Sequence, residues 1–90
     1  MKTFDIMAGG HKARVTLCLD GKGGFSGDIV SSDFGEGRIS GLATGDHLTG
    51  SVDLDGHAAR FDATLAGGAI AGRLTAGWFF SQDFQGEEVA

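Results

Sequence analysis

The chain holds three histidines and one cysteine, residue types that serve in metal binding, acid–base chemistry and nucleophilic attack. The histidines form no ligand-spaced pair of the HxH or HExxH kind, so we predict no metal site. His57 follows an Asp-Gly turn, at a place where a strand would begin. It is expected at the mouth of a barrel, as a hydrogen-bond partner for a ligand or as a base. A plain surface position is the simpler alternative.

Cys18 and the carboxylates complete no catalytic constellation. Cys18 lies on the same face of its strand as Arg14 and Thr16, and this is the outer face. No histidine that could activate its thiol is evident in the sequence. Asp46 and Asp55 lie in turns, where aspartate is common for conformational reasons. We therefore predict no catalytic residue and no cofactor.

The aromatic segment from Trp78 to Phe84 carries the strongest signal for ligand binding. Alternation along a strand puts Trp78, Phe80 and Gln82 on one face. Phe84 shares that face, which is expected to be the inner one. Near the end of a barrel, such residues offer a ligand both an apolar wall and a hydrogen-bonding group. We predict a ligand-binding site formed by these three residues and His57.

A set of outward-facing apolar residues predicts self-association. Alternation along the last strand directs Phe79 outward if its aromatic neighbours face inward. Alternation along their own strands also places Val30 and Leu42 on the outer face. Large apolar side chains that gather on an outer surface indicate contact with another molecule. We predict that these three residues form the interface of a homodimer. Local cover by the N-terminal segment around Phe4 is the alternative.

Short strands would position all of these side chains. Apolar and polar residues alternate, as in 14–20 and 59–65, and no window keeps a helical apolar stripe free of glycine. Glycine-containing turns separate the alternating runs. The expected strands are residues 3–8, 11–20, 24–32, 36–43, 47–54, 57–66, 69–75 and 78–88. Because short connections make sequential strands antiparallel neighbours, and closure removes open edges, the predicted fold is an all-β, eight-stranded antiparallel up-and-down barrel.

A repeated pattern of an apolar residue, any residue and a glycine places glycines on the inner face. It occurs at Phe25–Gly27, Ile39–Gly41, Leu48–Gly50, Ile70–Gly72 and Phe84–Gly86. Inner glycines either let the barrel coil tightly around its phenylalanines or open space for a ligand. The hairpin turn at 55–56 sets Gly50 opposite Phe61, an arrangement in which an aromatic ring covers a strand glycine.

Length and composition narrow the class of protein. One domain, residues 1–90, accounts for the chain. The formal net charge is −5 and the seven Lys and Arg residues are scattered, so nucleic-acid binding is not expected. No apolar run is long enough to span a membrane and no secretory signal is visible. We predict a cytoplasmic protein without nucleic-acid or membrane contacts; an exported mature domain stays an open alternative.

Residues 33–41, Asp-Phe-Gly-Glu-Gly-Arg-Ile-Ser-Gly, resemble the DFGxGxxSG strand of the transferrin-binding-lipoprotein type of β-barrel. That group contains surface lipoproteins and related solute-binding barrels of Gram-negative bacteria. Residues 79–89 are loosely similar to its closing strand, without the glycine and proline that follow the aromatic residue there. The resemblance implies a bacterial eight-stranded barrel that binds rather than catalyses. A looser similarity to avidin- and lipocalin-type barrels implies the same fold and no particular ligand.

Taken together, these patterns favour a non-enzymatic binding module. It would be a small homodimeric barrel that binds a protein partner or a small apolar ligand. One alternative is an enzyme of the cyclase or isomerase type, which would hold its substrate in the barrel cavity and use His57, Gln82 and Asp55. The other alternative is an accessory or structural subunit of a larger complex.

Overall fold

In the computed structural model the chain forms one closed sheet of eight antiparallel strands, each paired with its neighbours in sequence. The structure describes residues 1–33, 35–54, 56–77 and 80–89. The strands are β1 (Lys2–Ala8), β2 (His11–Leu19), β3 (Gly24–Ser31), β4 (Gly35–Thr44), β5 (His47–Leu54), β6 (His57–Ala66), β7 (Ala69–Ala76) and β8 (Phe80–Glu88). The predicted fold class is confirmed, and no strand end differs from its prediction by more than two residues. Among the described residues there is no helix that could cross a membrane.

Short glycine turns set the order and register of the strands. Gly56 has a φ of 84°, a conformation that residues with a Cβ rarely adopt. This turn gives the β5–β6 hairpin its predicted register, in which Leu54 pairs with His57 and Gly50 with Phe61. Because side chains alternate along a strand, this register directs the apolar residues of both strands to the inside.

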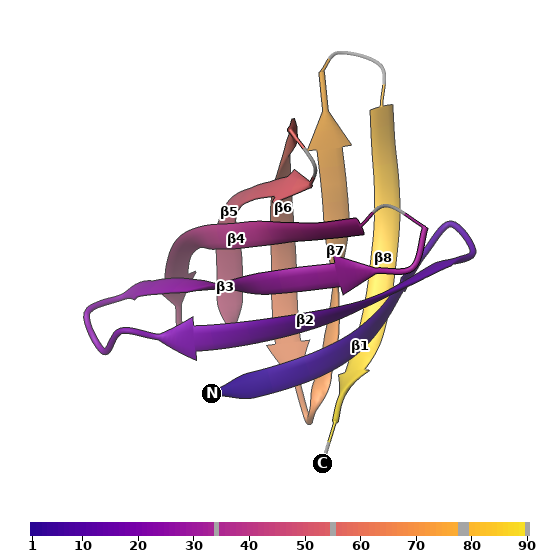
Figure 1. Ribbon diagram of the computed structural model, residues 1–90. Coiled ribbons are helices and arrows are strands. Elements are labelled where there is room, and N and C mark those ends of the chain that lie inside the picture. The colour runs from indigo at the N-terminus through magenta and orange to yellow at the C-terminus, as the bar shows by residue number, and fades with distance from the viewer. Residues whose placement is uncertain (34, 55, 78–79, 90) are drawn as a thin grey trace.

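The sheet closes between its first and last strands, where Phe4 pairs with Glu88 and Ala8 with Phe84. In Figure 1, β1–β4 run across the molecule and β6–β8 stand upright, so the two halves of the sheet cross. β4 and β5 both bend where the halves meet (Figure 1). Such bending lets one sheet change direction without opening an edge.

Inner glycines allow neighbouring strands to approach closely. Gly41 of β4 pairs with Gly50 of β5, and a Cβ on Gly41 would overlap the carbonyl oxygen of Thr49. Phe25 pairs with Gly41 on one side and Phe61 with Gly50 on the other, and the two rings lie 5.9 Å apart at 57°. At these positions the glycines therefore permit tight coiling around phenylalanines. The alternative that they open space for a ligand is wrong there, because a Cβ would meet backbone rather than a void.

The interior tapers from large side chains to small ones. Phe4 and Leu48 are each 1% exposed and fill the end where β1 and β5 begin, which we name the closed end. At the opposite end, which we name the mouth, the side chains that face inward include four alanines: Ala8, Ala13, Ala59 and Ala76. Larger side chains, among them Phe80, stand at the opening itself. The barrel is thus a cup, packed at its base and wide at its opening.

Asp20 fastens the turn between β2 and β3. Its Oδ1 accepts hydrogen bonds from the backbone N–H groups of Lys22 (2.6 Å) and Gly24 (3.0 Å). These bonds favour the ionised carboxylate and hold the pKa of Asp20 below its usual value. The turn therefore stabilises the folded state at neutral pH, and this contribution is lost as the pH falls through the lowered pKa.

Candidate functional site

The mouth of the barrel contains a cavity of about 660 Å³. The ends of β1, β3, β5 and β7 and the starts of β2, β6 and β8 form its wall. Small residues at this level leave space that large side chains occupy at the closed end. The deeper part of the wall consists of Ile6, Ile29, Val52, Leu54 and Leu74. The cavity is therefore apolar inside and open to solvent at the mouth.

Three of the four predicted ligand-binding residues lie together at the mouth. Phe80, Gln82 and His57 all line the cavity, at the starts of β8 and β6. Phe80 faces the barrel interior by alternation but is 52% exposed, because the barrel is open at this level. The Gln82 carboxamide donates a hydrogen bond from Nε2 to the carbonyl oxygen of Asp83 (3.0 Å). Trp78, the fourth predicted residue, lies outside the described residues.

A histidine–aspartate pair that we did not predict completes the rim of the mouth. His11 Nδ1 and Asp33 Oδ2 are 2.8 Å apart and join the start of β2 to the β3–β4 turn. The Asp33 backbone N–H donates to Ser31 Oγ (3.2 Å), and that buried hydroxyl donates to the Lys12 carbonyl oxygen (3.1 Å). Alternation along β2 places His11 on the inner face, so the sequence contained a signal that this side chain faces the barrel interior. Its partner is 22 residues away, so only the pairing of the strands could reveal the contact.

A second, smaller cavity of about 60 Å³ lies beneath the mouth. All the residues found to line it are apolar. The two cavities adjoin, because five residues line both: Ile6, Ile29, Val52, Leu54 and Leu74. Together they form an apolar path from the rim toward the centre of the barrel.

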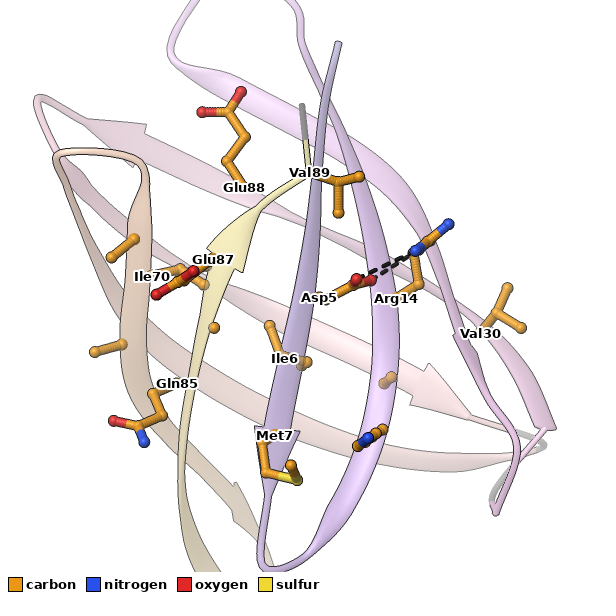
Figure 2. A pocket seen from close by; sticks show the side chains of 15 residues that line it. Asp5, Ile6, Met7, Arg14, Val30, Ile70, Gln85, Glu87, Glu88 and Val89 are labelled. Carbon is orange, nitrogen blue, oxygen red and sulfur yellow. Dashed lines mark hydrogen bonds and ion pairs between the residues drawn. The ribbon is translucent and has the colours of Figure 1, made fainter.

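The outer surface carries a groove of about 920 Å³ that extends over β7, β8, β1, β2 and β3 (Figure 2). Exposed Met7, Val30 and Val89 give it apolar surface. Arg14 donates two hydrogen bonds to the Asp5 carboxylate, Nε to Oδ1 at 2.8 Å and Nη2 to Oδ2 at 3.1 Å (Figure 2). This contact holds the pKa of the Asp5 carboxyl below its usual value. The groove lies on the outer surface and shares three lining residues with the mouth cavity: Ile6, Lys12 and Ala13.

The predicted interface residues do not form one patch. Val30 is 49% and Leu42 64% exposed, on neighbouring strands. Val30 pairs with Glu36, and Leu42 lies six residues further along β4, about 20 Å away at 3.3 Å per residue. Val30 lines the outer groove, whereas Leu42 lies away from it. Phe79 is outside the described residues.

Two further groups, Cys18 and His47, lie on the outer face. Cys18 is exposed, as its outward parity predicts. His47 Nε2 lies 2.9 Å from Asp62 Oδ1, a contact of the outer face. Asp55, a candidate for the enzymatic alternative, falls outside the described residues. In the ranges that the structure describes, no three His, Cys, Asp or Glu side chains gather closely enough to hold a metal ion.

The fold and the cavity define a class of protein, a small closed antiparallel barrel with an apolar cup at one end. Comparisons of the chain with protein-family models, with curated proteins and with solved structures found no match. The resemblance to the transferrin-binding-lipoprotein type of barrel therefore stays a prediction. Function has to be inferred from the geometry of the site.

Proposed function

We propose that this barrel is a binding protein that takes a small, largely apolar ligand into its mouth. The observation that carries the proposal is the taper of the interior. Large apolar residues fill the closed end, whereas alanines surround a cavity of about 660 Å³ at the mouth. At the closed end the same barrel closes around larger side chains. Closure alone therefore does not require alanine at the mouth. Apolar cavities of roughly 300–1,000 Å³ with a few polar groups are typical of small-molecule sites.

The composition of the rim supports a ligand that also carries a polar group. His57, Gln82 and the His11–Asp33 pair line the opening, above the apolar wall. The exposed ring of Phe80 also lies there. A ligand seated in the mouth would remove this ring from water, which contributes about 25 cal/mol for each Å² of apolar surface covered.

The substitution Ala59→Phe is expected to block ligand uptake. Ala59 is half-buried on the wall of the mouth, where it pairs with Val52, and a phenyl ring there would occupy the space of a ligand. The measurement is the fluorescence of 1-anilinonaphthalene-8-sulfonate during titration with protein. We expect saturable binding to the unmodified protein and a loss of affinity of at least roughly tenfold in the variant.

Ala66→Phe is the matched control for this titration. Ala66 lies on the same strand, faces outward near the closed end and is exposed, so the added ring should leave dye binding unchanged. Thermal unfolding followed by circular dichroism checks that both variants are folded. Equal dye affinity in all three proteins would contradict the proposal, because the dye would then bind somewhere other than the mouth.

We further propose that two copies of the chain associate through the outer groove. The groove combines the exposed apolar side chains of Met7 and Val30 with Lys12 on β2 and Glu87 on β8. In a two-fold dimer the same surface patch meets itself. Such a pairing would bring Lys12 of one copy toward Glu87 of the other and cover the apolar residues between them.

Val30→Asp is expected to convert the dimer into a monomer, because it places a charge within the apolar part of the interface. Size-exclusion chromatography with light scattering measures the mass directly. Leu42→Asp is the control, since Leu42 is also exposed but lies away from the groove. A dimer that resists Val30→Asp but dissociates with Leu42→Asp would contradict the proposed interface. A monomeric unmodified protein at all concentrations would contradict self-association altogether.

A further inference from the structure

A second cavity continues the mouth cavity downward. The small cavity of about 60 Å³ beneath it shares part of its apolar wall and extends toward the centre of the barrel. There it is lined by Val15, Leu48 and Phe84, none of which lines the mouth. A molecule that occupies the mouth can therefore reach deeper through this inner cavity.

The size of the inner cavity limits what can enter it. An engineered apolar cavity that binds benzene is more than twice as large, at about 150 Å³. A polar group would find no hydrogen-bond partner among the apolar side chains identified in the wall, which disfavours its entry. A slender apolar group, such as the end of an alkyl chain, is both narrow enough for the volume of the inner cavity and compatible with its apolar wall.

We infer that the ligand carries a single unbranched apolar tail whose end occupies the inner cavity, while its polar head remains at the rim. The inference rests on the proposed function and names the ligand class, a single-chain amphiphile. The head would lie beside His57 and Gln82. The described residues of the rim also include His11, whose imidazole contacts the carboxylate of Asp33. A carboxamide and an imidazole can donate N–H hydrogen bonds, and a carboxylate accepts them, so a carboxylate is a suitable head group for the probe.

The first test is the position of bound decanoate, observed by NMR on the full chain with labelled methyl groups. We expect nuclear Overhauser contacts from the terminal methyl of decanoate to the methyl groups of Val15 and Leu48. Contacts from this methyl only to residues of the mouth, such as Ala8 and Ala76, would overturn the inference.

The second test compares ligands that share a carboxylate head. Between octanoate and decanoate, each added methylene that enters the inner cavity should raise affinity about fourfold, which corresponds to about 0.8 kcal/mol. Adamantane-1-carboxylate has a compact bulky body and should bind at least roughly tenfold more weakly than decanoate. If it binds as tightly as decanoate, the inference on the tail fails while the proposed apolar site stands. If none of these compounds binds, both fail.

Val15→Ile gives a third, independent test by calorimetry. It adds one methyl group to the wall of the inner cavity, whose free space of about 60 Å³ can accept it. Decanoate should lose roughly fourfold in affinity for the variant, whereas adamantane-1-carboxylate should bind unchanged. Ser51→Thr adds one methyl group on the outer face of β5, where the side chain is exposed, and serves as the control. Unchanged affinity of decanoate for Val15→Ile would overturn the inference.

Discussion

Replacing Gly50 with valine is expected to prevent the barrel from forming. Gly50 pairs with Gly41, and a Cβ on Gly50 would overlap the carbonyl oxygen of Ser40 and press on the Cα of Gly41. Because the obstacle is backbone, rotation of a side chain cannot relieve it. We expect a destabilisation of at least about 4 kcal/mol. This approaches the whole stability of a small domain, about 0.05–0.15 kcal/mol per residue. Urea unfolding followed by far-UV circular dichroism measures the loss.

Ser51→Val is the matched control for this prediction. Ser51 is the next residue of β5, faces outward and is exposed, so the same β-branched side chain meets no backbone there. Its unfolding free energy should stay within about 0.5 kcal/mol of that of the unmodified protein. A Gly50→Val protein that unfolds at the same urea concentration as this control would show that the close approach of β4 and β5 is not needed for folding.

Phe4→Ala is expected to lower the unfolding free energy by about 3–5 kcal/mol. The side chain is 1% exposed and is among the largest fully buried groups of the described residues, at the closed end of the barrel. Its removal loses the transfer free energy of the ring and leaves a cavity that surrounding strands cannot close without breaking their pairing. The midpoint of urea unfolding should fall while the slope of the transition stays unchanged.

Met7→Ala provides the comparison on the same strand. Met7 faces outward and is 41% exposed, so at protein concentrations at which the chain is monomeric its truncation removes less buried surface and should cost under about 1 kcal/mol. If Phe4→Ala costs no more than Met7→Ala, the closed end is not the packed base that the burial of Phe4 and Leu48 indicates. The taper from which the ligand site is inferred would then lose its support.

Local patterns in the sequence determine the strands of this protein and their order. Alternation shows which face of a strand each residue occupies, and glycine turns show where a strand ends. Both signals depend on residues close together in the chain. They were therefore sufficient to predict eight antiparallel strands and the β5–β6 register, with Gly50 opposite Phe61.

Part of the candidate site follows from the same local signals. Phe80 and Gln82 share the inward face at the start of β8, and His57 begins β6. In an up-and-down barrel the even-numbered strands all start at the same end. Parity and turn positions together therefore predict that these residues gather at one opening, and the structure places all three around the mouth cavity.

The cavity itself was decided by the tertiary structure. Alternation distinguishes inside from outside, but it does not say how the strands are staggered around the barrel. Closure through the pairing of β1 with β8 fixes that stagger. The register of β2 with β3 brings His11 beside Asp33 across 22 residues, and the register of β3 with β4 keeps Val30 and Leu42 apart. The free space at each level depends on inward side-chain volumes summed over all eight strands. That sum is a property of the assembled barrel, so only the folded chain shows a packed base and an open mouth.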